Sequence, residues 1–246
     1  MNEEQNGAAF TTKLTGRTEA AERTMMFRFE KPPGWAFKPG QFIEVSLIRS
    51  PETDAEGDTR AFSIASAPGE PEIMVATRMR DSAFKRVLGR LPLGTLVQME
   101  GPFGDLMLHN NVSRAAVFLT GGIGVTPVRS ILVRAARERL PHRLYLFYSN
   151  RRPEDALFLE EMYALERENP NFRFVPTMTE MAHSHREWRG ETGYVSRELL
   201  HKHLEGAQSA VYYITGPPGL VSAMRTMLNQ SAVDDDDIRT EEFTGY

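Results

Sequence analysis

The chain has 246 residues, a formal net charge of −4 at pH 7, 41% hydrophobic residues and 25% charged residues. This length suits two ordinary domains, and the acidic balance argues against a nucleic-acid partner, which would favour a basic face. The chain has no cysteine, which excludes disulfides, zinc–thiolate sites and a cysteine-ligated iron–sulfur cluster within it. No apolar run approaches the roughly 20 residues of a membrane span. Because the first residues do not resemble a secretory signal, we expect a cytoplasmic protein without a membrane partner.

The first hundred residues read as short strands separated by turns. Runs of β-favouring residues predict strands at 10–17, 23–30, 41–48, 60–66, 72–79 and 95–101. One helix is predicted at 82–90, capped by Asp81 or Ser82, and the polar stretch 50–59 is predicted to be a loop. This pattern is typical of an antiparallel six-stranded β-barrel with one helix.

Strands and helices alternate from about residue 114 onward. Strands are predicted at 115–119, 144–148, 172–175, 211–214 and 238–243, with helices at 127–139, 153–169, 196–204 and 218–229. Such alternation predicts an α/β doubly wound parallel sheet. The composition places the boundary within a polar, turn-prone segment, which gives domains 1–108 and 109–246. The four aspartates at 234–237 are expected to form a solvated turn.

A glycine-rich turn follows the first strand of the predicted parallel sheet. It contains Gly121, Gly122 and Gly124, after which Thr126 is a candidate helix cap and Pro127 the first helical residue. Glycines let the backbone approach a bulky anion, and the free N–H groups at a helix start then bind it. Taken alone, the pattern also suits a tight turn without a ligand.

A second turn with this character follows a later strand, at Thr215-Gly216-Pro217. Ligands of open α/β sheets bind outside the carboxyl ends of the strands. Both turns are expected at that edge, which makes a bound nucleotide a better explanation than folding alone.

Five motifs occur in an order that resembles the ferredoxin–NADP reductase superfamily. They are Arg60-x-Phe62-Ser63, Gly101-Pro-Phe-Gly104, Gly121-Gly-x-Gly-x-Thr-Pro127, Thr215-Gly-Pro217 and Glu241-x-Phe243. The resemblance covers nearly the whole chain. It implies an N-terminal flavin-binding barrel, a C-terminal NAD(P)-binding domain, and hydride transfer from nicotinamide C4 to flavin N5.

The resemblance assigns the flavin site to the first domain. It implies that Arg60 pairs with the flavin phosphates, that Phe62 packs on the isoalloxazine where the family usually has tyrosine, and that Ser63 lies beside N5. The segment 78–85 resembles the helix start that holds the FAD pyrophosphate, so the implied cofactor is FAD rather than FMN. The remaining residues assigned to FAD are Ala61, Ile64, Ser66, Arg78, Ser82, Ala83, Phe84 and Lys85.

The resemblance assigns the nicotinamide coenzyme to the second domain. Thr215 takes a position near the nicotinamide that is often cysteine, and Glu241 would bond the nicotinamide or relay a proton. Either Phe243 or Tyr246 would cover the flavin face, and the sequence does not decide between them. The pyrophosphate cradle is assigned to Gly121, Gly122, Gly124, Thr126, Pro127, Gly216 and Pro217.

The sequence does not decide whether the chain binds the 2′-phosphate that distinguishes NADPH from NADH. Glu180 stands where NADPH-specific members carry a basic pair, which favours NADH. Arg151 and Arg152 follow the second strand of the sheet, where they would either bind a 2′-phosphate or remain solvated. NADH and NADPH are therefore both retained as substrates.

The resulting expectation is an FAD-dependent NAD(P)H oxidoreductase that passes electrons to a separate carrier protein such as ferredoxin or flavodoxin. Alternatives are the reductase component of an oxygenase and a free-flavin or quinone reductase. A non-redox nucleotide-binding module is the alternative from a different class. No metal site is expected, because the histidine pairs at 183 and 185 and at 201 and 203 would not share a helix face.

Overall fold

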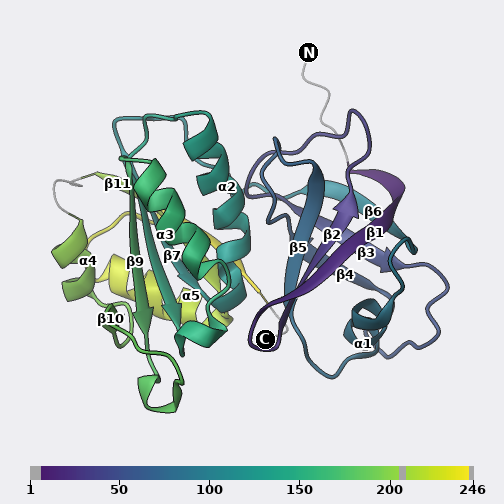
Figure 1. Ribbon diagram of the computed structural model, residues 1–246. Helices are drawn as coiled ribbons and strands as arrows, with labels where there is room; N and C mark the ends of the chain where they lie inside the picture. Colours follow the sequence, from purple (N-terminus) through teal and green to yellow (C-terminus); the bar gives the residue numbers. More distant parts are fainter. Residues whose placement is uncertain (1–6, 205–208, 244–246) are drawn as a thin grey trace. The chain divides into compact units, whose positions relative to one another are not determined.

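The computed structural model describes residues 7–204 and 209–243, which form two compact units (Figure 1). The first unit contains the described residues up to Met107 together with Thr126–Arg134, and the second contains Leu108–Val125 and the described residues from Ala135 onward. The segment Thr126–Arg134, which the alternation of strands and helices assigned to the second domain, thus groups with the first unit. None of the helices in the described residues has the length and apolar character that a membrane crossing requires.

The first unit is a six-stranded antiparallel sheet, as predicted. Its strands follow the order β4-β3-β6-β1-β2-β5. They are β1 (Ala8–Ala21), β2 (Thr24–Glu30), β3 (Phe42–Leu47), β4 (Thr59–Ser63), β5 (Glu72–Arg78) and β6 (Leu96–Phe103). Just beyond β4, the Ala65 amide donates to the Met74 carbonyl in β5 at 2.8 Å, which brings the two edges together and curls the sheet into a barrel. Strand β1 is longer than predicted because two register shifts bend it along both β2 and β6.

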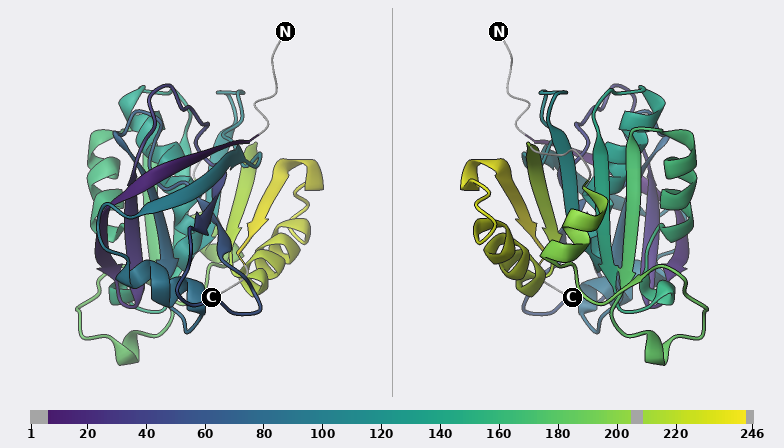
Figure 2. Two further views of the ribbon diagram at one scale, coloured as in Figure 1. Left: turned by 90° about the vertical axis from the view of Figure 1, so that its right-hand side faces the viewer. Right: turned by 90° about the vertical axis from the view of Figure 1, so that its left-hand side faces the viewer.

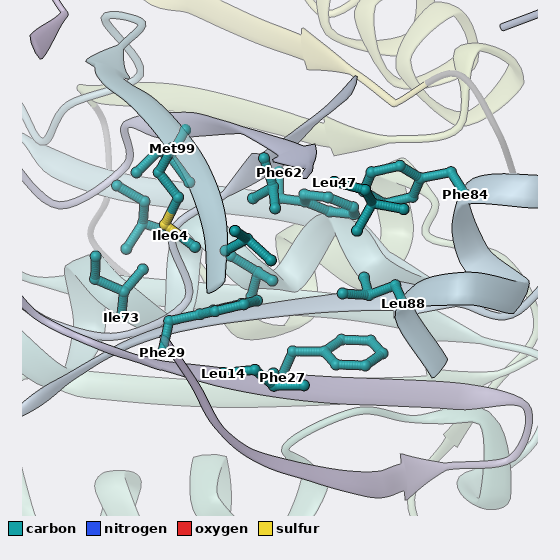
Figure 3. Packing of buried hydrophobic residues seen from close by; sticks show 14 of the residues in the cluster. Leu14, Phe27, Phe29, Leu47, Phe62, Ile64, Ile73, Phe84, Leu88 and Met99 are labelled. Carbon is teal, nitrogen blue, oxygen red and sulfur yellow. The ribbon is translucent and has the colours of Figure 1, made fainter. Parts of the chain in front are cut away.

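The barrel core is filled by alternate residues of the strands and by one helix (Figure 3). Helix α1 (Ala83–Arg90) inserts Phe84 and Leu88, both fully buried, among these strand residues. Of the two caps considered, Ser82 is the one observed: its hydroxyl accepts from the Lys85 amide at 3.4 Å.

The second unit is a parallel sheet with strand order β10-β9-β8-β7-β11-β12. Its strands are β7 (Ala115–Gly121), β8 (Leu144–Asn150), β9 (Phe172–Met178), β10 (Glu191–Thr192), β11 (Ala210–Gly216) and β12 (Ile238–Glu242). The two-residue strand β10 has no counterpart in the sequence-based prediction.

Helices cover both faces of this sheet, which is the doubly wound arrangement expected. Tyr163 of α3 (Leu159–Glu168) packs on Phe174 with ring centroids 5.0 Å apart. The opposite face carries α4 (Arg197–His203), whose His203 ring lies 6.3 Å from Phe147. That face also carries α5 (Pro218–Asn229), drawn in yellow beside β11 and β12 in Figure 2.

Two predicted helix starts were wrong. A 3-10 turn, η1 (Gly122–Gly124), leads directly into α2 (Val125–Arg137), so Thr126 lies inside a helix and does not cap one. The helix expected at 153–169 is interrupted after η2 (Pro153–Asp155) and resumes only as α3. Phe158 adopts a left-handed conformation (φ 61°) at this break, which stops a continuous helix.

Candidate functional site

The glycine turn of the second unit is held against the end of β11 by one side chain. The hydroxyl of Thr215 donates to the Gly124 carbonyl at 2.7 Å, and Thr215 is 0% exposed. A Cβ at Gly124 would lie 2.2 Å from the Thr215 carbonyl oxygen, so only glycine allows this approach. The sequence-based assignment of Thr215 to the neighbourhood of the nicotinamide stays a prediction, and the structure shows that its hydroxyl binds the turn.

The rest of the turn is fixed by backbone conformation and by a tyrosine that the sequence reasoning missed. Gly122 has a φ of 52°, in the left-handed region that favours glycine. The Tyr148 hydroxyl donates to the Gly122 carbonyl at 3.0 Å from the neighbouring strand β8. A Cβ at Gly121 would lie 2.6 Å from a methyl group of Leu220 in α5. The backbone of the turn is therefore tightly packed against β8 and α5.

The C-terminal motif lies at the same edge of the sheet. Thr215 of β11 pairs in register with Glu241 of β12, and the Phe243 amide donates to the Gly216 carbonyl at 3.0 Å. Pro217 precedes the first residue of α5, so a helix N-terminus begins beside these strand ends. The structure thus brings together the two turns and the Glu241-x-Phe243 motif. The alternative aromatic residue, Tyr246, lies outside the described residues.

Two further residues assigned to the pyrophosphate cradle follow the glycine turn directly. Thr126 and Pro127 are in the first turn of α2, and Thr126 is 1% exposed. The side chain of Thr126 therefore has almost no surface to offer a ligand. The assignment of both residues to the cradle stays a prediction.

The two arginines after β8 have different surroundings. Arg152 binds Asp155 through two bonds, of 2.8 Å and 3.2 Å, and the Asp155 side chain is 4% exposed. Arg151 is largely exposed, and its Nε lies 3.6 Å from Glu180 Oε1. The Glu180 amide also donates to the Arg151 carbonyl at 2.8 Å. Arg151 and Glu180, which the sequence weighed as opposing signals, are therefore direct neighbours.

In the first unit, Arg60 lies next to the start of α1. Its guanidinium stands 5.2 Å from the centre of the Phe84 ring. Phe84 in turn packs on Phe62, with ring centroids 5.9 Å apart. Strand β4 and the beginning of α1 are thus joined by one continuous contact, and the predicted phosphate-binding residues Arg60 and 82–85 gather there.

Positive charge is concentrated at this helix start. Burial, together with the nearby charges of Arg80 and Arg60, lowers the pKa of Lys85 from 10.5 to about 8. The Lys85 ammonium donates to the Arg78 carbonyl at 2.8 Å. A bound anion would favour the charged form of this ammonium, which burial and the two neighbouring arginines disfavour.

The residues assigned to the isoalloxazine are mostly buried. Phe62 is 8% exposed and is part of the barrel core, so little of its side chain is open to a planar ligand. Ser63 and Ile64 are also buried, whereas Ala61 is exposed. The Ser66 hydroxyl is used internally, where it accepts from the Met74 amide at 3.0 Å.

Two further contacts of the first unit were not predicted from the sequence. Arg129 binds Glu70 at 2.8 Å and donates to the Ala65 carbonyl at 2.7 Å, which secures the chain after β4. Asp54, in the loop predicted at 50–59, accepts from the Ala83 amide at 2.7 Å. The acidic composition of the loop was a visible signal, but its partners are distant in sequence.

Comparison with known proteins finds one matching domain model and several relatives. Residues 118–226 match the oxidoreductase NAD-binding domain family. The reductase component of phenol 2-monooxygenase from Pseudomonas sp. (strain CF600) is 29% identical over 213 residues, covering 84% of this chain and 58% of that protein. The glycine betaine monooxygenase reductase subunit of Chromohalobacter salexigens is 27% identical over 224 residues, covering 90% of this chain and 60% of that protein. The chain therefore spans less than two thirds of these relatives.

Solved structures share the whole two-unit fold. A ferredoxin NADP⁺ reductase from Neisseria gonorrhoeae with bound FAD and NADP has a TM-score of 0.77 and 22% identity, covering 95% of this chain and 98% of that chain. A cytochrome P450 reductase from Amycolatopsis has a TM-score of 0.81 and 21% identity, covering 97% of this chain and 71% of that chain. The chain therefore has the two-unit fold of these two proteins.

Proposed function

We propose that this chain is an FAD-dependent NAD(P)H oxidoreductase. The observation that carries the proposal is the edge where the Thr215–Gly124 bond holds two glycine-containing turns together beside Glu241 and Phe243. Backbone N–H groups at such turns suit a dinucleotide pyrophosphate. Glu241 pairs with Thr215 through the backbone of β12, and we assign its carboxylate to a carboxamide of the nicotinamide type.

The start of α1 fits the diphosphate of FAD. Together with Arg60 of β4, it offers the Ala83 amide and the Lys85 ammonium, whose pKa is lowered first by burial and then by the charges of Arg80 and Arg60. When bound, FAD would supply the hydride acceptor and release electrons onward. The tasks of this chain are then to orient the isoalloxazine beside Ser63, to present its phosphates to α1, and to keep water away with the buried residues 62–64.

NADH is the coenzyme that the charges favour. Glu180 lies beside Arg151 and would oppose a 2′-phosphate there, while the fork of Arg152 is already bound to Asp155. A second phosphate would have to compete with both carboxylates, whereas a ribose hydroxyl would not. We therefore infer a preference for NADH over NADPH.

The electron acceptor we propose is a separate protein carrier, since the chain has no cysteine to ligate a cluster. Ferredoxin and flavodoxin are the candidate carriers. In the alternative function, as the reductase component of an oxygenase, the electrons pass to the oxygenase. That alternative function is supported by the relatives named as reductase components of phenol and glycine betaine monooxygenases. Fast turnover with free flavin or quinones, without any carrier, would favour the third alternative. The cytoplasmic location stays a prediction.

The test is the visible spectrum of the purified protein under anaerobic conditions, with FAD supplied and NADH or NADPH added in separate runs. We expect a protein-bound flavin spectrum that bleaches with NADH at lower concentrations than with NADPH. A flavin that stays oxidised with both coenzymes, or a protein that binds no FAD, would overturn the proposal and favour a non-redox nucleotide-binding module.

A further inference from the structure

The acidic loop between β3 and β4, residues 52–58, folds back onto Arg60. Nη1 of Arg60 donates to the carbonyl oxygens of Glu56, Gly57 and Thr59 at 2.9, 2.9 and 2.8 Å. Its Nη2 donates to the Glu56 carboxylate at 2.7 Å. The loop therefore occupies both terminal nitrogens of the arginine that we propose for the flavin phosphates.

Asp54 of the same loop reaches the second group of that site. One carboxylate oxygen accepts from the Ala83 amide at 2.7 Å, at the first residue of α1. The other accepts from the Glu56 amide at 3.0 Å and lies 3.6 Å from Arg60 Nη2. The bond from the Ala83 amide is the main cause that lowers the pKa of Asp54, so this carboxylate is ionised at neutral pH.

We propose that the acidic loop is an internal anion that competes with the FAD diphosphate and thereby sets the flavin affinity. This inference rests on the proposed function, since it assigns the diphosphate to Arg60 and the start of α1. The Ala83 N–H is a single donor that cannot fully serve Asp54 and a phosphate at once. A diphosphate brought beside Asp54 and Glu56 would also meet two like charges. Binding therefore requires the loop to withdraw.

The loop is built so that its middle can move while one end stays attached. Gly57 has a φ of 73°, and a Cβ placed on it would find no atom within 4 Å. The Glu56 side chain is 71% exposed, so its displacement uncovers little apolar surface. At the other end, Glu52 pairs with Arg86 and touches neither Arg60 nor the Ala83 amide through any described contact. Glu52 is therefore a matched control for the charge of the loop.

The experiment compares the dissociation constant of FAD for the flavin-free protein and its variants Asp54→Asn, Glu56→Gln and Glu52→Gln, measured by quenching of flavin fluorescence. Asparagine can still accept from the Ala83 amide, so Asp54→Asn removes the charge while keeping this bond. We expect about tenfold tighter FAD binding for Asp54→Asn and for Glu56→Gln, because the bond that the diphosphate must displace becomes a weaker, neutral one and the like charge is removed. Glu52→Gln should match the unmodified chain.

Riboflavin separates competition for the phosphates from a general loosening of the site. It lacks a phosphate, so Asp54→Asn should leave its affinity unchanged. Three results would overturn the competition and leave the oxidoreductase proposal standing. They are equal FAD affinities for all variants, the same increase of FAD affinity in Glu52→Gln, and an equal increase of riboflavin affinity in Asp54→Asn. In a fourth result, the unmodified chain and all variants fold, as judged by thermal unfolding without flavin, and still bind no FAD. That result would overturn both the competition and the oxidoreductase proposal.

Discussion

The hydroxyl of Thr215 and the carbonyl of Gly124 are joined at 2.7 Å across the ends of two neighbouring parallel strands. This bond is the described hydrogen bond of the Thr215 hydroxyl, whose assignment to the nicotinamide stays a prediction. It also makes the shape of the glycine turn depend on β11, because Gly124 stands where a side chain has no room. The coenzyme turn and the strand beside it thus form one unit of structure.

Gly124→Ala tests this dependence. The added methyl would lie 2.2 Å from the Thr215 carbonyl oxygen and 2.6 Å from its carbon, so the backbone must shift. We expect a loss of about 1–3 kcal/mol in the free energy of unfolding and a large fall in NADH affinity, with FAD binding retained. Gly219→Ala is the control, since its Cβ would meet nothing within 4 Å at the start of α5. Chemical denaturation and coenzyme titration of both variants measure the difference, and similar losses in both would refute it.

Substitutions of Arg151 and Arg152, the two arginines after β8, should differ in their effects on stability and on coenzyme use. Arg152→Ala removes both described bonds from Arg152 to the buried carboxylate of Asp155, so we expect it to destabilise the second unit by about 1–3 kcal/mol and to weaken both coenzymes. Arg151→Ala should leave stability unchanged and weaken NADPH alone. Glu180→Gln should improve the use of NADPH several-fold, because it removes the charge facing Arg151.

The measurement is kcat/KM for both coenzymes together with the unfolding midpoint. Arg189→Ala is the control, because this arginine is 92% exposed and lies 3.7 Å from Glu187. A selective NADPH defect in Arg152→Ala, or an unchanged coenzyme ratio in Glu180→Gln, would contradict the assignment.

The sequence supports the architecture more fully than it supports the site. Periodicity and turn residues predicted the barrel, a helix cap at Asp81 or Ser82 and the parallel sheet, because these depend on local preferences and on one buried face per element. The break at Phe158 was missed, since a left-handed residue between apolar neighbours leaves no compositional signal. The meeting of Asp54 with the Ala83 amide and of Arg129 with Glu70 depends on tertiary folding, which brings together groups far apart in the chain.

Lys85 should make FAD binding depend on pH. Its pKa of about 8 in the flavin-free protein lies below its ordinary 10.5, and a bound diphosphate would raise it again. Binding then takes up a proton above pH 8, so the affinity falls as the pH rises. We expect the dissociation constant of FAD to increase by about tenfold from pH 7 to pH 9. Lys85→Arg, which stays charged throughout, should bind FAD with little pH dependence. A flat profile for the unmodified chain, or the same slope in Lys85→Arg, would argue against a role for this ammonium.

His109 should make the stability of the second unit depend on pH. Its ring lies against His142 and Tyr213, with Nδ1 3.0 Å from the Tyr213 hydroxyl and Nε2 3.3 Å from the Arg114 carbonyl. Arg114, Asp237 and Arg239 are the charged groups around this cluster. Burial is the main cause that lowers the pKa of His109 below 6.5. The folded chain therefore binds this proton more weakly than the unfolded chain.

A depressed histidine pKa means that the stability is complete above pH 6.5 and falls as the pH drops toward the folded value. We expect the denaturant midpoint of the unmodified chain to fall between pH 7.5 and pH 5.5 by more than that of His109→Gln, which cannot take up the proton. His201→Gln is the control, because this histidine is exposed at the end of α4. Carboxylate titration contributes equally to all three proteins, so the comparison isolates the buried ring. A decrease of the same size in His109→Gln would show that another group is responsible.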